Sequence, residues 1–221
     1  MISTKNLTAM PPVSKLHQLC KSLSALELIV SPEWQYRYYS YAPHWAEGEE
    51  VMEMRDGSGD EMLVLFNQAG CVINGIAHEY FNPQDRIPRI EDLTHGLPEA
   101  FEQFMFGEPV KSIYSTFCIW SADGETWQTG ITTGEEDGSA EILDIFAGDP
   151  QQYVDFCADY YEQEVPLEVV TQVYAGEPIT AEMLNSLNPE ASVREAKAEL
   201  DDIGYPNQLV VKRRRLFGLI G

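Results

Sequence analysis

A glycine-rich acidic turn is the first part of this chain whose residue types could perform chemistry. The stretch MRDGSGDEMLVLF places the side-chain oxygens of Asp56, Ser58 and Asp60 at alternate positions, and an apolar run follows at once. A calcium-binding EF-hand needs oxygen ligands at such positions, then a glycine at loop position 6 and a glutamate at position 12. Those two positions hold Glu61 and Asn67, so the sequence does not predict a calcium site.

Two other interpretations of the same turn fail on its context. A phosphate-binding loop precedes a helix whose N-terminus faces the anion. Here the apolar run after the turn predicts a strand, and the carboxylates of the turn would repel phosphate. A nucleophile elbow needs the pattern G-x-S-x-G between a strand and a helix, and Gly57-Ser58-Gly59 lacks that spacing. We therefore interpret the turn as the entrance to a buried strand and predict neither a metal ion nor a cofactor.

His78-Glu79 is the second candidate for chemistry. A histidine beside a carboxylate can act as a general base with an orienting partner. Asp60 could face His78 across the predicted hairpin, so Asp60, His78 and Glu79 are the catalytic candidates of an enzyme hypothesis. The structural alternative is a histidine that is hydrogen-bonded at the end of a strand.

Aromatic residues in β-prone segments are the candidates for binding. They are Trp34, Tyr36, Tyr38, Trp120 and Trp127. Aromatic side chains on one face of a sheet could form a groove for a sugar or a peptide. The turn Asp123-Gly124 predicts a two-residue hairpin that places Trp120 opposite Trp127. Packing in the core explains the same residues equally well.

The elements that must position these residues fall into two groups. Apolar residues at helical spacing predict an N-terminal helix over 14–30, which ends before Pro32. Hairpins occupy the middle of the chain, with strands over 61–66 and 71–78 and over 116–122 and 125–131. From about residue 139 the chain predicts helices, including 167–174, 181–187 and one that begins with a capping box at Ser192. Strands followed by helices predict an α+β fold, in which an antiparallel sheet is packed by the N-terminal helix and the C-terminal helices.

The domain boundaries follow from changes in composition. We expect residues 1–13 to be a flexible lead, residues 14–206 to form a single α+β domain, and residues 207–221 to form a basic and apolar tail. Within the tail, residues 212–215 read Lys-Arg-Arg-Arg. This segment could fold back on an acidic domain, touch a membrane surface, or fray as an ordinary terminus.

The charge of the chain limits its partners. It carries 36 acidic against 14 basic residues, a net charge of −22, with 44% hydrophobic residues. Such a chain repels nucleic-acid phosphates and anionic lipid surfaces, because affinity for them comes from Lys and Arg. We expect a basic protein partner, no nucleic acid and no stable membrane insertion, and the sequence gives no sign of an oligomeric state. Solubility alone is the other explanation of the acidity.

The cysteines and the N-terminus indicate the compartment. Cys20, Cys71, Cys118 and Cys157 are far apart and show neither zinc-binding nor redox spacing. The N-terminus lacks an export signal, and no segment approaches the ~18 apolar residues of a membrane span. We therefore expect a cytoplasmic protein with four free, buried thiols.

Two stretches resemble known bacterial proteins. The run from Asp56 to Phe66, followed by Gly70 to Glu79, resembles the central hairpin of the SUKH superfamily of immunity proteins. The whole chain, with its run from Trp34 to Tyr41, is similar to a bacterial protein family of unassigned function. The SUKH resemblance implies a non-catalytic protein that neutralises a toxin by binding it, through acidic and aromatic contacts.

Three hypotheses of function remain open at this point. The first is a non-catalytic acidic protein that binds a protein partner, with an immunity-like role. The second is an enzyme that acts on a small molecule or a carbohydrate, with His78 and nearby carboxylates beside an aromatic sheet face. The third is a structural or regulatory module whose acidity maintains solubility.

Overall fold

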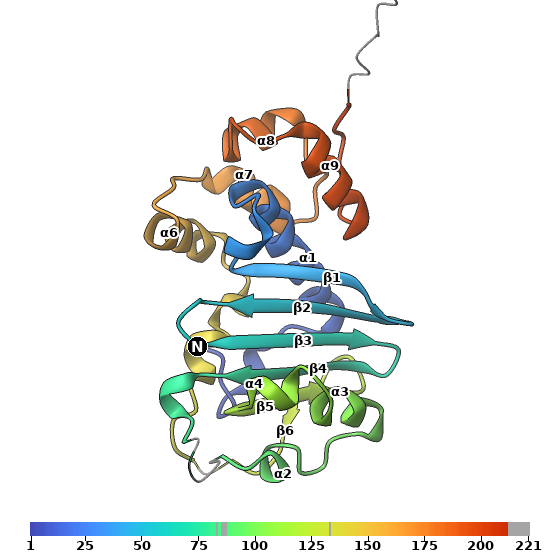
Figure 1. Cartoon of the computed structure of the whole chain (residues 1–221), viewed down its shortest axis with the longest axis vertical. Coiled ribbons are helices and arrows are strands. Elements are labelled where there is room, and N and C mark those ends of the chain that lie inside the picture. The colour runs from blue at the N-terminus through green and yellow to red at the C-terminus, as the bar shows by residue number, and fades with distance from the viewer. Residues whose placement is uncertain (83, 85–87, 133, 212–221) are drawn as a thin grey trace, which may run out of the picture.

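The computed structural model describes residues 1–82, 84, 88–132 and 134–211. Its centre is a six-stranded antiparallel sheet in which strands that follow each other in the chain lie side by side (Figure 1). The strands are β1 (Tyr39–Ala46), β2 (Glu49–Arg55), β3 (Glu61–Asn67), β4 (Gly70–Ile76), β5 (Phe117–Ser121) and β6 (Gln128–Thr129). The predicted α+β fold is confirmed.

Helices precede, interrupt and follow the sheet. The α-helices are α1 (Val13–Val30), α2 (Ile90–Leu93), α3 (Glu102–Phe106), α4 (Val110–Ile113), α5 (Ser139–Ile142), α6 (Pro150–Tyr160), α7 (Leu167–Tyr174), α8 (Ala181–Leu187) and α9 (Val193–Asp202). Short 3-10 turns are η1 (Leu7–Ala9), η2 (Trp34–Tyr36), η3 (His78–Tyr80), η4 (Glu99–Phe101) and η5 (Asp144–Ala147). Among the described residues, no helix is both long and apolar enough to cross a membrane.

Alternate side chains of the strands pack into two different cores, one on each face of the sheet. In β3, Met62, Val64 and Phe66 belong to the core that contains α1, whereas Leu63 and Leu65 belong to the core on the other side. This period of two is the geometry of a strand that is buried on both faces. The sheet is therefore the middle layer of the molecule.

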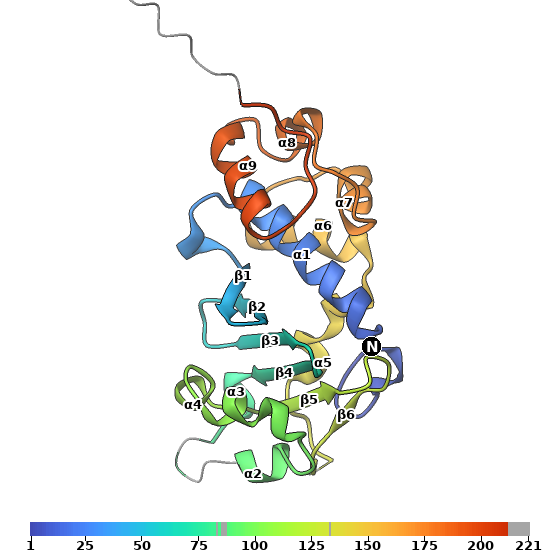
Figure 2. The same cartoon turned by 90° about the vertical axis from the view of Figure 1, so that its right-hand side faces the viewer.

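The helix α1 is the central element of the larger core. It runs beside the sheet, and α6 to α9 gather around it (Figure 2). Leu16, Leu23 and Leu26 are fully buried, because the sheet covers one side of the helix and the C-terminal helices cover the other. The helix confirms the predicted position over 14–30 within one residue.

Side-chain caps begin α6 and α9, and the cap of α9 is the one predicted at Ser192. Asp149 accepts a hydrogen bond from the backbone N–H of Gln151, and Pro150 is the first residue of α6. Ser192 accepts one from the backbone N–H of Glu195 at the start of α9. Such caps satisfy backbone donors that the first turn of a helix leaves unpaired.

The opposite face of the sheet is covered by the segment between β4 and β5. Phe101, Phe104, Met105 and Val110 come from η4, α3 and α4 and are buried against the sheet. These short helices interrupt the strands, so the separation of strands and helices that the sequence suggests is incomplete. They form the second covering layer.

The hairpin of β3 and β4 confirms its prediction and explains its glycine. Asn67 pairs with Gly70, and β4 ends at Ile76, two residues before the predicted end. Gly70 has φ +126, and a Cβ there would lie 2.0 Å from the carbonyl oxygen of Ser121 on β5. Only glycine allows this close approach of two strands.

The second predicted hairpin is wrong in its register. Trp120 pairs with Gln128 rather than with Trp127, and the two tryptophans lie in different cores. Asp123 accepts hydrogen bonds from the backbone N–H groups of Glu125 and Thr126, at 2.9 and 2.7 Å. The turn therefore extends through residue 126, and β6 is only two residues long.

The N-terminal segment packs against the domain, where we expected a flexible lead. Ile2 and Met10 are buried, and the backbone N–H of Thr4 donates to Ser139 Oγ at 3.0 Å. Apolar anchors at both ends of the segment explain this packing. At the other end of the chain, Leu209 is buried, while residues 212–221 of the predicted tail lie outside the described residues.

The four cysteines are free and buried, as predicted. Burial raises the pKa of the Cys20, Cys71, Cys118 and Cys157 thiols. These thiols therefore act as small apolar groups of the core.

Candidate functional site

The register of the sheet brings six of the eight candidate residues to one end, and only Trp120 and Trp127 lie elsewhere. Tyr39 pairs with Met54, Met54 with Met62, and Met62 with Gly75. The segments just outside these positions are η2, the turn of residues 56–60 and η3. They therefore share one end of the sheet, although they span more than forty residues of sequence.

Asp60 and His78 meet across the hairpin. The Asp60 Oδ1 atom lies 2.7 Å from His78 Nδ1 and accepts a hydrogen bond from the His78 backbone N–H at 2.9 Å. The hydrogen bond to Asp60 raises the pKa of the exposed His78 imidazole, and the negative charge of Glu79 adds to the effect. The structure thus brings together two catalytic candidates, and Glu79 follows as an exposed neighbour.

Asp56 holds the turn in shape. Its Oδ1 atom accepts hydrogen bonds from the backbone N–H groups of Ser58, Gly59 and Asp60 at 2.8 to 2.9 Å. The Ser58 hydroxyl donates to Asp56 Oδ2. Despite partial burial, these hydrogen bonds lower the pKa of the Asp56 carboxyl. The carboxylate therefore serves the turn itself, in agreement with an architectural role.

The predicted binding aromatics separate into two sets. Trp34 and Tyr36 are 56% and 62% exposed, and Tyr38 is partly buried beside them. Trp120 and Trp127 are buried, and their indole N–H groups donate to Gln128 Oε1 and to the carbonyl of Pro11. The latter pair belongs to the cores, and of the five predicted binding aromatics only Trp34 and Tyr36, both in η2, present their rings to solvent.

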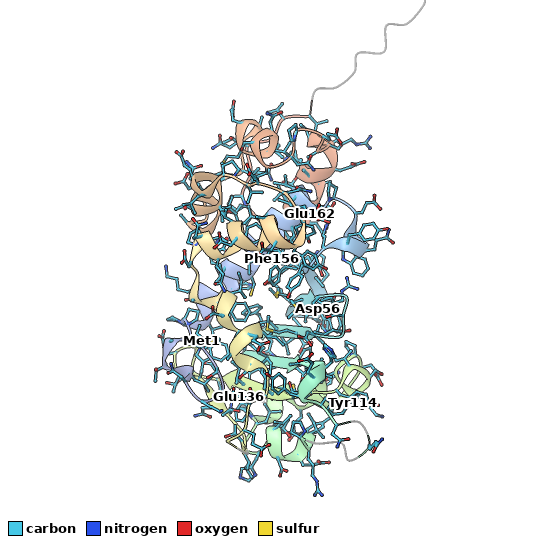
Figure 3. The ribbon with its side chains drawn as sticks, turned by 90° about the vertical axis from the view of Figure 1, so that its left-hand side faces the viewer. Met1, Asp56, Tyr114, Glu136, Phe156 and Glu162 are labelled. Carbon is cyan, nitrogen blue, oxygen red and sulfur yellow. The ribbon has the colours of Figure 1, made fainter. Side chains whose placement is uncertain are left out.

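The end of α6 completes the exposed surface beside η2. The Tyr160 hydroxyl donates to the carbonyl of Asp56 at 3.1 Å, and its ring is 44% exposed. Asp56 lies below the C-terminal end of α6, where Glu162 follows the helix (Figure 3). We call the set Trp34, Tyr36, Asp56, Asp60, Tyr160 and Glu162 the acidic–aromatic surface.

Further carboxylates lie near these rings, at the start of β3 and the end of β2. Burial raises the pKa of the Glu61 carboxyl at the start of β3, and the nearby charge of Glu53 raises it further. Arg55 is the neighbouring cation: its Nε atom lies 3.5 Å from Glu53, and its guanidinium is 4.4 Å from the ring of Trp34. Repulsion among these carboxylates favours the approach of a further cation.

The fully buried carboxylate of Glu27 forms hydrogen bonds to segments that carry the acidic–aromatic surface. Glu27 Oε1 accepts from the Tyr153 hydroxyl at 2.9 Å, and Oε2 accepts from the Tyr161 hydroxyl at 2.6 Å. The backbone N–H groups of Tyr38 and Tyr39 also donate to Oε2. Burial raises the pKa of the Glu27 carboxyl in spite of these hydrogen bonds. Glu27 thus ties α1 to α6 and to the start of β1.

A polar cluster at the opposite end of the sheet was missed by the sequence analysis. The Glu50 carboxylate is within 3.1 Å of His17 Nε2, the Tyr41 hydroxyl and Lys21 Nζ. The Lys21, Tyr41 and His17 hydrogen bonds lower the pKa of Glu50 to about 2, although its partial burial opposes them, and burial lowers the pKa of His17. The spacing of His17 and Lys21 on one helical face is the signal that could have indicated it.

Within the described part of the chain, no group of three His, Cys, Asp or Glu side chains is arranged to hold a metal ion.

In comparisons with known proteins, no family model matches the chain, and no curated protein and no solved structure matches it significantly. The function proposed below therefore rests on the geometry of the chain itself.

We predict that replacing Asp60 with Asn lowers the pKa of His78 toward its ordinary value. The amide keeps the size of the side chain and removes the charge that stabilises the imidazolium. The measurement is an NMR titration of the His78 ring, with the exposed His44 as an internal reference. An unchanged titration of His78 would show that the pair does not form in solution.

Proposed function

We propose that this chain is a non-catalytic acidic protein that binds a basic protein partner through the acidic–aromatic surface. The observation that carries the proposal is the exposure of Trp34 and Tyr36 at the end of the sheet that also holds the carboxylates of Asp56 and Asp60. Trp and Tyr dominate the energetics of protein interfaces because they bury a large area at little entropic cost.

The charge of the chain supports a basic partner. A net charge of −22 produces a long-range field that accelerates the encounter with a cationic protein and repels anionic ones. The Arg55 guanidinium already lies against the Trp34 ring at 4.4 Å. An arginine of the partner could use the same surface in the same way, by a cation–π contact beside carboxylates.

The rigidity of the surface also supports a binding role. Tyr161 donates to Glu27 and lies 3.3 Å from the carbonyl of Tyr36, so the buried network reaches the exposed segment. Pre-organised aromatic anchors lose little entropy on binding. The resemblance to immunity proteins favours a basic toxin as the partner, neutralised by covering its active cleft.

The proposal predicts which substitutions weaken binding. We expect Trp34→Ala with Tyr36→Ala to weaken the complex with the partner at least tenfold, which corresponds to about 1.4 kcal/mol. Trp45→Ala is the matched control, because Trp45 is 40% exposed but lies at the far end of β1. The partner is isolated by affinity capture at low salt, purified, and titrated against each variant by calorimetry.

Salt provides the second readout of the same experiment. Charge steering predicts that the association rate falls steeply as the ionic strength rises. A captured protein that binds the Trp34→Ala, Tyr36→Ala variant as tightly as the native chain would contradict the proposal. So would binding that is insensitive to salt.

The enzyme hypothesis is favoured by one observation, the 2.7 Å contact between Asp60 and His78. A double variant distinguishes it from the binding hypothesis. His78→Ala with Glu79→Gln should leave partner affinity within about twofold if the protein is a binder, because neither side chain belongs to the aromatic contacts. An enzyme that uses His78 as its base would lose at least about a hundredfold in rate.

A further inference from the structure

Residue 81, residues 88–92 and residues of 105–115 line a pocket of about 690 Å³ that the acidic–aromatic surface does not include. Its volume falls within the range of about 300 to 1,000 Å³ that is common for small-molecule sites. Its apolar wall is formed by Phe81, Ile90, Met105, Phe106, Val110 and Tyr114. Phe106 and Tyr114 are 48% and 44% exposed, so apolar rings are open to solvent here.

The ring of Tyr114 is held at the pocket by an unusual backbone conformation. Tyr114 has φ +69, in the left-handed region that non-glycine residues rarely adopt. Its ring stacks on Phe81, with the ring centres 4.9 Å apart. A strained residue of this kind persists only where its surroundings fix it, and such residues are common at binding sites.

A buried amide in the central sheet fixes this corner. Asn74 of β4 is fully buried, and its Nδ2 atom donates to the carbonyl of Tyr114 at 3.1 Å. Ser115 donates its hydroxyl to Asn74 Oδ1. A polar side chain is expensive to bury in the middle of a sheet, and here its hydrogen bonds serve to place Tyr114 at the pocket.

The two cations of the pocket form no ion pair with a described carboxylate. Lys5, Lys21, Arg37, Arg55 and Lys197 each form an ion pair with a carboxylate. Within the described ranges, Lys15, Arg89, Lys111 and Arg194 form none. Two of these, Arg89 and Lys111, line the pocket from separate segments. Unneutralised cations beside an apolar wall are complementary to an amphipathic anion.

Two acidic side chains also line the pocket and affect which ligand charge it favours. Glu91 and Asp92 follow Arg89 on α2, so the lining carries as many acidic as basic side chains. Lys111 stands on a different helix, α4, next to the wall residue Val110. The local balance is therefore neutral in a chain whose net charge is −22.

We propose that this pocket binds a small amphipathic carboxylate, whose apolar body packs on Phe106 and Tyr114 and whose anionic group lies at Arg89 and Lys111. This site is independent of the proposed partner surface and goes beyond that function. Either property can fail without the other, since they use different residues.

Calorimetric titration of the full chain with decanoate, below its micellar concentration, tests the proposal. We expect saturable binding of one decanoate per chain, and binding at least tenfold weaker to the Arg89→Ala, Lys111→Ala variant. The matched control is Lys15→Ala with Arg194→Ala, which removes two cations that are likewise exposed and form no ion pair, and which should bind like the native chain.

Two further titrations separate charge from apolar contact. Tyr114→Gly keeps the positive φ without steric cost and removes the ring, so decanoate should bind it at least tenfold more weakly. Decyltrimethylammonium carries the same chain with the opposite charge and should bind more weakly than decanoate. The proposal is overturned if decanoate does not bind, if the Arg89→Ala, Lys111→Ala variant binds it unchanged, or if the cationic probe binds more tightly.

Discussion

Glu27→Ala is expected to destabilise the protein by about 3 to 5 kcal/mol, a large fraction of the stability of a typical domain. The substitution leaves the Tyr153 hydroxyl and the Tyr39 backbone N–H without an acceptor in a buried site. The Tyr161 hydroxyl and the Tyr38 N–H lose their bonds to Glu27 and keep only the Tyr36 carbonyl and the Tyr161 hydroxyl as acceptors. Each unsatisfied buried donor costs about 1 to 3 kcal/mol, reduced where water enters. Denaturation in urea, followed by tryptophan fluorescence, measures the loss.

Glu27→Gln is the control that separates hydrogen bonding from charge. The glutamine oxygen can still accept at the Oε2 position, so the loss should be clearly smaller than for alanine. Because the folded-state pKa of Glu27 is raised, its titration contributes stability at acidic pH that is lost as the pH rises through that pKa. The native chain should therefore lose its advantage over Glu27→Gln as the pH rises from about 4. A loss below 1 kcal/mol for Glu27→Ala would show that the network is not a structural support.

Gly70→Ala is expected to cost about 3 to 5 kcal/mol, from two effects that act together. A Cβ at this position would lie 2.0 Å from the carbonyl oxygen of Ser121, a backbone atom that cannot move without breaking the pairing of β4 with β5. The positive φ of +126 adds strain for any residue with a side chain. Thermal and urea unfolding measure the sum.

Gly48→Ala isolates the strain from the clash. Gly48 also has a positive φ, of +75, but its Cβ would meet nothing within 4 Å. We expect Gly48→Ala to cost about 1 kcal/mol, well below Gly70→Ala. Equal costs at the two positions would mean that the contact with Ser121 relaxes at no cost.

Local sequence patterns correctly indicate the elements whose partners lie close in the chain. The helix over 14–30 has its apolar spacing, and the caps at Asp149 and Ser192 have their donors within three residues. The hairpin of β3 and β4 is fixed by a short turn and by apolar strands. The second hairpin is predicted wrongly, because the side chain of Asp123 accepts hydrogen bonds from the backbone N–H groups of Glu125 and Thr126 and so lengthens the turn.

The candidate site is partly visible in the sequence. The spacing of Asp60 and His78 suggests that they face each other across a hairpin, and their 2.7 Å contact agrees. Tyr160 gives no such signal, because it reaches Asp56 from a helix about a hundred residues later. Glu27 gives none either, since a glutamate in an amphipathic helix is ordinarily solvated.

By itself, the sequence determines the acidity of this protein, the N-terminal helix and the first hairpin, because these depend on composition and on neighbours in the chain. The tertiary structure alone decides which aromatic rings are exposed and which charges remain without a partner. Trp34 and Trp120 are the same residue type in β-prone segments, yet one is 56% exposed and the other 2%. The difference arises from what packs against each, and those neighbours are brought together only when the sheet and its two helical layers have formed.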